Sequence, residues 1–547
     1  MPIRRTPLLA ALVIALVATV AAPPPQAAAA GRRNEPVGAL PTPADFVTQQ
    51  YEDFLARSPD VSGLAYWTDV LGAGLEPAAL VEWLALSDEF SGVVAPVVRL
   101  YRAHFLRPPD PEGLAHWTAV LRSGVSLNRI SEEFVDSAEF EALYGAVDDD
   151  AYVELVYRNV FDRSADPSGA FYWQQRLAGG MTRGELMAAF SDSAEYRDRT
   201  DGRVRATMLY VGMLRRSPDA GGLDYWSNVL DGGVPYRNVI AGFLGASEYT
   251  DRIGSIYREI HPLTGVPTRA AGRHPALAVK IDNVDRARPQ QGIGRADVVY
   301  EEMVEGNLTR LIAVFHSDVP TTVGPVRSIR TTDIDVLAQL NTPLLAASGA
   351  NSGVLAAVAG ADVVNVNATA VAGAYHRRGD RRAPHNLYAD TGALYGAAGG
   401  AGGTPPALFR HRAPGSTPGG VAAAGVDIAF GLADIGFRWS AVDGGWRRTQ
   451  NGTAHTVEDG TWLAPENVVV LEVTYGASSV DARSPEAHTV GTGVAHVFSA
   501  GRRTTGSWTR ATADEPIRLL DGNGNEVALT RGRTFVELAP VGTVTLR

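Results

Sequence analysis

The sequence contains no cysteine among its 547 residues. This absence excludes disulfide bonds, thiol nucleophiles and cysteine-ligated metals. It also excludes a lipid anchor attached to a cysteine. Net positive charge is lacking as well, because the formal net charge of the chain is −11. Nucleic acid is therefore not an expected partner, since broad nucleic-acid binding needs a basic surface.

The N-terminus has the three regions of a secretory signal peptide. Arg4 and Arg5 precede an apolar run, Leu8–Val20, and the small residues Ala27–Ala30. We expect residues 1–30 to be a signal peptide and the protein to be secreted or placed in the cell envelope. The alternative is a retained membrane anchor, although the run is shorter than the ~20 residues that a span requires. No later segment is long and apolar enough, so no stable membrane span is expected after signal cleavage.

The first half contains a four-fold repeat that is marked by tryptophan. The tryptophans are separated by 50, 56 and 53 residues, and each follows a glycine by four positions and an aspartate by seven. Apolar residues at helical spacing predict about three helices for each unit. We expect residues 41–255 to form a four-unit helical repeat domain that buries apolar faces between neighbours. The repeated positions are Asp60, Gly63 and Trp67; Asp110, Gly113 and Trp117; Asp166, Gly169 and Trp173; and Asp219, Gly222 and Trp226.

The aspartates and tryptophans of the repeat each allow two interpretations. A proline next to each aspartate ends one helix, and the carboxylate is predicted to cap the next helix. A calcium site is the alternative, but each unit offers too few oxygens for one. The tryptophans are expected in the core, because they share a helix face with Leu and Val, rather than as platforms for sugars.

The repeat resembles a family of bacterial surface and secreted proteins with the motif Pro-Asp-x-x-Gly-Leu-x-Tyr-Trp and no known function. The first unit matches this motif from Pro59 to Trp67. The second unit has His116 in place of tyrosine, and the third has Asp166-Pro167 and Ala170 in place of Pro-Asp and Leu. The resemblance covers roughly residues 44–253, and it implies an all-helical interaction module without a known reaction.

The second half has a different pattern. Strand-like runs, such as Leu277–Ile281 and Val298–Met303, alternate with alanine-rich helical stretches and predict an α/β domain over residues 261–410. Shorter strand-like runs separated by turns predict a β-rich C-terminal domain over residues 426–547. The expected fold class is therefore multidomain, with an all-α repeat array followed by an α/β domain that has a β-rich C-terminal subdomain.

Five separated motifs occur in order in this half: AVKIDN at 278–283, ARPQ at 287–290, ADVVYEE at 296–302, VGPVRS at 323–328 and APHNLY at 383–388. Together they resemble the YerB family of bacterial envelope lipoproteins, over nearly all of residues 261–547. That family has no settled activity, so the resemblance implies a location and an architecture but no reaction. Its members are typically anchored through a lipidated cysteine, which this chain lacks.

Catalytic chemistry has only scattered candidates in the sequence. There is no Gly-x-Ser-x-Gly elbow of a serine hydrolase, and no close spacing of metal ligands, so neither a metal site nor a cofactor is predicted. Carboxylates and histidines are left for acid–base cleavage of a glycosidic bond. The candidate catalytic residues are Glu302, His316 and His385.

Arginines near the predicted loops suggest binding of anions. The guanidinium group binds carboxylate or phosphate through two parallel hydrogen bonds, and the cell envelope offers peptide carboxylates, teichoic phosphates and acidic sugars. Structural ion pairing with nearby aspartates explains the same residues equally well. The candidate ligand-binding residues are Asp282, Asn283, Arg288, Arg327, Arg330, Arg382, His385 and Asn386.

The sequence favours a secreted cell-envelope protein that binds envelope polymers or surface proteins without catalysis, with the helical array as its docking part. The alternative is an enzyme that cleaves or modifies peptidoglycan or a related cell-wall glycan. Convergence of the three candidate catalytic side chains would favour the enzyme. Arginines gathered without an acid–base pair would favour binding.

Overall fold

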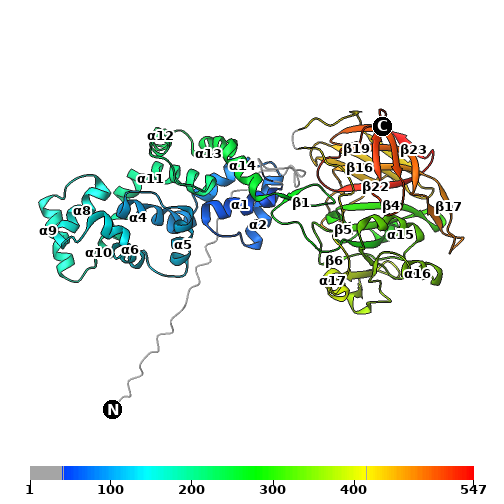
Figure 1. Ribbon diagram of the computed structural model, residues 1–547, viewed down its shortest axis with the longest axis horizontal. Coiled ribbons are helices and arrows are strands. Elements are labelled where there is room, and N and C mark those ends of the chain that lie inside the picture. The colour runs from blue at the N-terminus through cyan, green and yellow to red at the C-terminus, as the bar shows by residue number, and fades with distance from the viewer. Residues whose placement is uncertain (1–39, 41, 414–415) are drawn as a thin grey trace, which may run out of the picture. The chain divides into compact units, whose positions relative to one another are not determined.

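The computed structural model describes residues 40, 42–413 and 416–547, and the predicted signal peptide at residues 1–30 lies outside them. The described chain divides into two compact units. The helical unit comprises residues 52–57 and 81–236, and the sheet unit comprises 58–80, 237–547 and the described residues of 30–51. The expected fold class is confirmed, since helices fill the first half and a strand-rich α/β region follows (Figure 1).

The repeat folds into short helices. No helix in residues 40, 42–413 and 416–547 is long and apolar enough to cross a membrane. Two π-helical turns, Phe90–Val94 and Leu209–Leu214, adjoin the α-helices of this half. The helices are α1 Pro43–Leu55, α2 Val61–Gly72, α3 Pro77–Ala85, α4 Ala95–Phe105, α5 Pro111–Arg122, α6 Leu127–Val135, α7 Ala138–Tyr144, α8 Asp149–Phe161, α9 Pro167–Ala178, α10 Arg183–Ser191, α11 Ala194–Met208, α12 Ala220–Asp231, α13 Tyr236–Leu244 and α14 Ser247–Ile256.

The repeated aspartates cap helices, as the sequence predicts. Each precedes a helix and accepts a hydrogen bond from the backbone N–H three residues later, which satisfies one of the free amides of the first turn. That amide always belongs to the repeated glycine. The four pairs are Asp60 with Gly63, Asp110 with Gly113, Asp166 with Gly169 and Asp219 with Gly222.

The repeated glycine is required by a tyrosine from the preceding helix. A Cβ added at Gly113 would lie 2.5 Å from the Tyr101 hydroxyl. The same collision with Tyr157 would occur at Gly169. Of the four repeat tryptophans, Trp67 is buried, as expected of a core residue, whereas Trp117, Trp173 and Trp226 are partly exposed. Trp117 still packs edge-on against Phe134, with ring centroids 5.1 Å apart.

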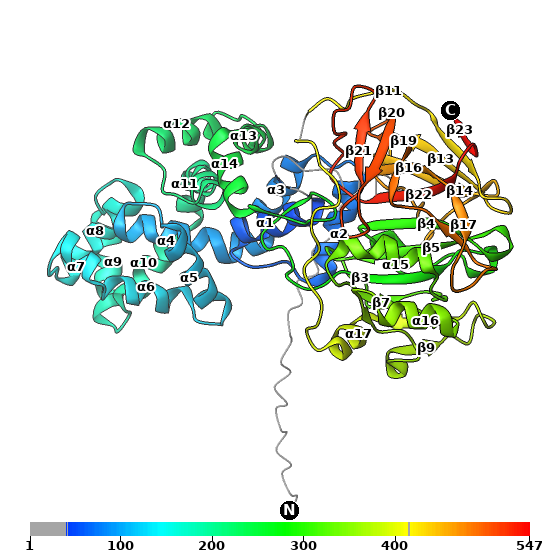
Figure 2. The ribbon, with the colours of Figure 1, turned by 45° about the vertical axis from the view of Figure 1, so that its right-hand side comes forward.

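One large sheet joins strands from both predicted parts of the second half. Its order is β11-β20-β19-β16-β22-β4-β5-β3-β7-β8, with β21 paired to β20. β22 pairs in parallel with both β16 and β4, so a C-terminal strand lies beside a strand of the α/β region (Figure 2). The bounds are β3 Leu277–Asp282, β4 Val298–Val304, β5 Leu308–Phe315, β7 Leu344–Ala346, β8 Val364–Asn365, β11 Val421–Ala422, β16 Asn467–Val473, β19 Gly491–Ser499, β20 Arg502–Arg510, β21 Arg518–Asp521 and β22 Thr534–Pro540.

Smaller sheets and the helices α15, α16 and α17 complete the second half of the chain. A five-stranded sheet has the order β15-β14-β13-β12-β23, and a three-stranded sheet has the order β6-β10-β9. The bounds are β1 Glu259–Ile260, β2 Pro267–Thr268, β6 Thr322–Val323, β9 Tyr375–Arg377, β10 Leu387–Asp390, β12 Gly425–Ala429, β13 Asp434–Ser440, β14 Gly445–Gln450, β15 Thr453–Ala454, β17 Tyr475–Ala477, β18 Pro485–Ala487 and β23 Val544–Leu546, with α15 Thr331–Leu337, α16 Ser352–Ala359 and α17 Thr391–Ala398.

The central strands of the large sheet are buried on both faces. Successive side chains of a strand point to opposite faces, so Val298 and Tyr300 of β4 pack in one core cluster and Val299 packs in the other. The same alternation separates Glu301 from Glu302. Both glutamates are fully buried. Each therefore needs a buried hydrogen-bond or ion-pair partner.

Candidate functional site

The end of strand β3 carries a buried carboxylate that three basic side chains share. Asp282 is the last residue of β3 and is fully buried. His385 Nδ1 lies 2.7 Å from its Oδ2, Arg327 Nε lies 3.3 Å from the same oxygen, and Arg310 Nη1 lies 3.4 Å from Oδ1. Arg310 is the register partner of Asp282 in the β3–β5 pair. The backbone N–H of Arg327 donates to the Lys280 carbonyl, so the sheet positions the group, which we call the Asp282 cluster.

Positive charge exceeds negative charge in the Asp282 cluster. Two guanidinium groups share one carboxylate, and protonation of His385 would add a third positive charge. Burial lowers the pKa of Arg310, Asp282 opposes this change, and the neighbouring Arg327 lowers the pKa further. The side chains of Arg327 and His385 are 23% and 18% exposed, so a ligand can reach them from solvent.

The loop between β9 and β10 brings His385 to the cluster. Asn386, which is buried, organises this loop, because its side-chain amide donates to the carbonyls of Arg378 and Arg381 and its oxygen accepts from Arg377. Arg381 in turn donates to the carbonyls of Ala287 and Pro289, at 2.7 Å each. Asn386, a candidate ligand-binding residue, thus supports the loop, and the loop is fastened to the segment that follows β3.

The remaining arginine candidates have different surroundings. Arg330 forms two 2.7 Å contacts with Glu305, from Nε and from Nη2. Arg288 forms an ion pair with the exposed Asp285. The guanidinium groups of Arg330 and Arg288 therefore each have a carboxylate partner already. Arg382 is exposed in the β9–β10 loop.

Asn283, the next candidate, faces away from the Asp282 carboxylate. Its amide donates to Glu301 Oε1 at 2.8 Å and to the Thr309 hydroxyl at 2.7 Å. It is 1% exposed. The alternation along the extended chain puts Asp282 and Asn283 on opposite faces, so Asn283 serves a buried polar network rather than the solvent-accessible cluster.

Glu302 lies in a closed ion-pair group with Lys280 and Asp333. Lys280 Nζ contacts Glu302 Oε1 and lies 2.6 Å from Asp333 Oδ1, and all three side chains are 0% exposed. Burial raises the pKa of Glu302 to about 7, although Lys280 opposes this change, and Asp333 raises the pKa further. A dissolved polymer does not reach a carboxyl with no exposed surface.

His316 lies at the other end of the sheet. It follows the last residue of β5, whereas Arg310 stands near the start of the same strand. Six residues of strand at about 3.4 Å each separate them by roughly 20 Å. The His316 ring packs on His274, with centroids 4.6 Å apart, and burial followed by His274 lowers its pKa to about 4. His316 is thus far from the Asp282 cluster, whereas Glu302 is the register partner of Arg310 but is enclosed with Lys280 and Asp333.

The sequence pattern did not predict two sets of polar residues. The pairing of Arg310 with Asp282 depends on the register of β3 and β5, which no local pattern encodes. The second set surrounds Arg448, whose Nη2 lies 2.6 Å from Glu301 Oε2. Glu537 is opposite Glu301 in the β22–β4 pair, and burial, followed by Glu301, raises its pKa well above the usual range. The sequence signal for this second set is a charged residue, Glu537, inside the apolar run Phe535–Leu538.

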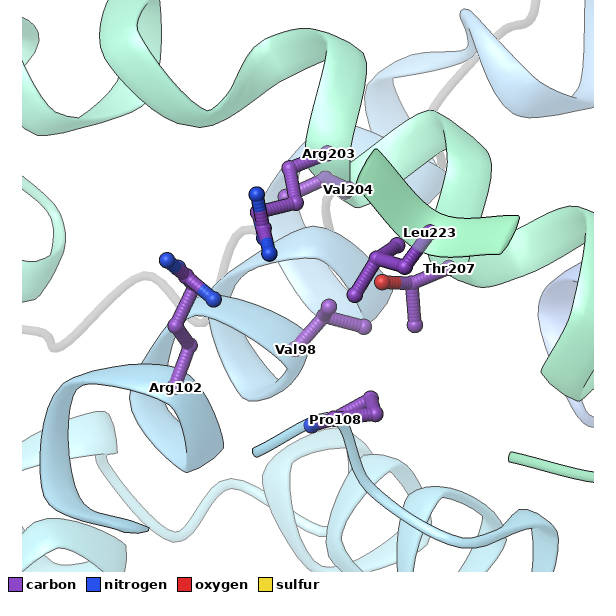
Figure 3. A pocket seen from close by; sticks show the side chains of 7 residues that line it. All are labelled: Val98, Arg102, Pro108, Arg203, Val204, Thr207 and Leu223. Carbon is purple, nitrogen blue, oxygen red and sulfur yellow. The ribbon is translucent and has the colours of Figure 1, made fainter. Parts of the chain in front are cut away.

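The helical unit has a small hollow between α4, α11 and α12 (Figure 3). Arg203 donates to Asp224 at 2.6 Å. Burial lowers the pKa of Arg102, and Arg203 lowers it further. The hollow is lined by no carboxylate and no histidine, so it offers no acid–base pair. Its lining residues are Val98, Arg102, Pro108, Arg203, Val204, Thr207 and Leu223.

Parts of both halves match family models of domains of unknown function. Residues 263–404 match the N-terminal domain of the protein of unknown function DUF3048, and residues 426–536 match its C-terminal domain. Residues 34–94, 131–200 and 203–253 match the domain of unknown function DUF4214. The Asp282 cluster lies wholly in the first of these matches. Among the described residues, no group of three or more His, Asp or Glu side chains is arranged to hold a metal ion.

A sequence match and a solved structure both carry the YerB name. The Bacillus subtilis (strain 168) protein "Putative lipoprotein YerB" is 49% identical over 71 residues, which are 13% of this chain and 21% of that protein. This match thus spans about a fifth of the relative. The crystal structure of the YerB protein from Bacillus subtilis aligns with 53% of this chain and 99% of its own, at 23% identity and a TM-score of 0.48. Residues 263–404 and 426–536 are thus similar to DUF3048 domains, and part of the chain is similar in sequence to YerB.

Proposed function

We propose that the protein is secreted or held in the cell envelope and binds anionic groups of envelope polymers at the Asp282 cluster, without catalysis. The location is supported by the name of the YerB relative, which describes a lipoprotein, and by the signal-peptide pattern of residues 1–30. In this proposal the helical repeat, residues 41–255, docks to surface partners, while the DUF3048 region, residues 261–410 with 426–547, binds the polymer.

The observation that carries the proposal is the sharing of one carboxylate by three basic groups. A structural ion pair needs one carboxylate for each guanidinium group. Arg310 and Arg327 instead meet at Asp282, and His385 occupies the same oxygen as Arg327. An incoming phosphate or carboxylate would supply the missing negative charge, and the planar arginine fork suits both anions.

The neighbouring loops extend the positive charge. Residues 284–289 and 376–386 contain six arginines against two aspartates, in a chain whose overall charge is −11. Arg286 and Arg382 are exposed. Arg378 is matched by Asp380 and Glu458, and Arg288 by Asp285. The excess positive charge therefore resides in the remaining four arginines, which are Arg286, Arg377, Arg381 and Arg382. A polymer with a charge in each repeat unit would contact the Asp282 cluster and these loops together.

The enzyme alternative has weaker support. It requires an acid–base pair at one bond, but Glu302 is enclosed with Lys280 and His316 lies at the opposite end of β5 from Arg310. His385 keeps the one arrangement typical of a general base, an imidazole oriented by a carboxylate. Its second ring nitrogen has no carboxylate partner among the residues that the structure describes.

The proposal is tested by sedimenting purified protein with isolated cell walls. Arg327→Ala is expected to weaken wall binding at least about tenfold, since a charge-assisted contact contributes roughly 1.5–3 kcal/mol. Arg518→Ala is the matched control, because Arg518 is an exposed arginine on β21, away from both loops. Equal binding by wild type and Arg327→Ala would reject the Asp282 cluster as the binding site.

The same tubes test for catalysis. Soluble fragments released from the walls are measured over time for wild type and for His385→Gln, which removes the base. Binding without release supports the adaptor function. Release that stops in His385→Gln would replace our proposal with an enzyme.

A further inference from the structure

The chain contains one lysine and 48 arginines. That lysine, Lys280, lies in the middle of β3, the strand that ends at Asp282. It is 0% exposed. A sequence that uses arginine at every other basic position thus places its one side-chain primary amine in the core. An amine differs from a guanidinium group in being a nucleophile when it is neutral.

Two carboxyl groups meet this amine, and each is held differently. Asp333, on the first turn of α15, presents Oδ1 to Lys280 Nζ at 2.6 Å, while its Oδ2 accepts from the Arg330 backbone N–H at 2.7 Å. Glu302, on β4, contacts Nζ through Oε1. Its Oε2 is buried and has no hydrogen-bond partner among the described residues. Asp333 is therefore fixed in orientation, whereas Oε2 of Glu302 is left to accept or donate a proton.

We propose that Lys280 and Asp333 condense to an intramolecular isopeptide bond, with Glu302 as the proton carrier. A bond forms between Nζ of Lys280 and Cγ of Asp333, and a C–O bond of the Asp333 carboxyl breaks. The amine loses a proton to Glu302, and Glu302 delivers a proton to the departing oxygen. One amide and one water molecule result, and neither an oxidant nor a cofactor is consumed.

The site suits this condensation because all three side chains are enclosed, with 0% exposure. A desolvated lysine is a competent nucleophile. The pKa of Glu302, raised to about 7 mainly by burial, lets this group both accept and release a proton near neutral pH. Tyr300 and Val336 of the adjoining core cluster are buried, which keeps out the water that would hydrolyse the product.

The bond would fasten two elements that are 53 residues apart in the chain. It would join β3 to the start of α15, and so it would hold the intervening segment that carries Arg327 and Arg330. The chain has no cysteine for a disulfide bond, and an amide would supply a covalent link that reducing agents do not open. This inference does not depend on the polymer-binding proposal.

The test is mass spectrometry of the full chain, purified and denatured. We expect the peptides that contain Lys280 and Asp333 to be joined and to weigh one water molecule less than their sum. Lys280→Met and Asp333→Ala should abolish the joined peptide. Glu302→Gln should slow its formation by about 100-fold, the usual effect of removing a positioned proton carrier. Asp335→Asn, on the same helix, is the matched control and should keep the link.

Because the chain has one lysine, its reactivity gives a second measurement. In denatured wild type, an amine-reactive reagent should label no lysine side chain, whereas in denatured Asp333→Ala it should label Lys280. Both measurements are made on unfolded chains, so they can also be carried out on a variant that folds poorly. Separate peptides and a fully labelled Lys280 in wild type would overturn the proposal. A link from Lys280 to Glu302 would overturn the assignment of Asp333.

Discussion

Asp282 and His385 are separated by 103 residues and are joined by a 2.7 Å hydrogen bond between Oδ2 and Nδ1. The bond connects the last residue of β3 to the loop before β10. It places an imidazole and the basic β9–β10 loop beside Arg327. The basic side chains of the Asp282 cluster are therefore arranged around one buried carboxylate.

Neutralising this carboxylate should have opposite effects on stability and binding. In Asp282→Asn the shape is kept, but Arg310 and Arg327 lose their counter-charge, which should lower the free energy of unfolding by about 2–3 kcal/mol. The folded variant should bind phosphate more tightly, because its positive charge is no longer offset. Urea unfolding and calorimetric titration measure the two effects. Asp285→Asn, which removes an exposed carboxylate, should change stability by less than about 0.5 kcal/mol.

Stability should fall as the pH rises through the range in which Glu302 titrates. Burial raises its folded pKa from the ordinary 4.5 to about 7, so the folded state holds a proton that the unfolded state has released. This contribution is fully present below pH 4.5 and is lost as the pH rises toward about 7. Glu302→Gln cannot titrate. The difference in unfolding free energy between wild type and this variant should therefore change across that range, and a constant difference would contradict the shift.

The helix caps can be tested by replacing one repeated aspartate. Asp110 accepts from the Gly113 N–H at the start of α5. Asp110→Ala should lower the unfolding free energy by about 1 kcal/mol, whereas Asp110→Asn should be nearly neutral, since asparagine caps as well as aspartate does. Chemical denaturation of the full chain, followed by tryptophan fluorescence, measures both. Equal loss in both variants would mean that the charge, rather than the cap, matters.

The repeated glycine makes a second prediction for the same unit. Gly113→Ala would drive a methyl group against the Tyr101 hydroxyl and should cost about 1–3 kcal/mol of unfolding free energy. Tyr101→Phe removes the hydroxyl and should restore part of the loss in the double variant. A double-mutant cycle measures this coupling. Additive effects would show that the collision is relieved in another way.

Local patterns were enough to predict the helical half. The Asp-x-x-Gly spacing specifies a cap within one turn, and the apolar spacing specifies the buried face, so the aspartates have the predicted role and Trp67 is buried as predicted. These features depend on neighbours a few residues away. The alternation that separates Glu301 from Glu302 is equally local.

Tertiary structure decided the chemistry of the second half. The sequence offered Glu302, His316 and His385 as one catalytic group, but strand direction puts His316 at the opposite end of β5 from Arg310, and pairing with Lys280 encloses Glu302. Likewise, β22 enters the sheet beside β4 and sets Glu537 against Glu301. Register between distant strands selects the partners of a buried charge, and no local pattern encodes that register. For this reason the candidate residues were visible in the sequence, whereas their grouping around Asp282 and Lys280 came only from the fold.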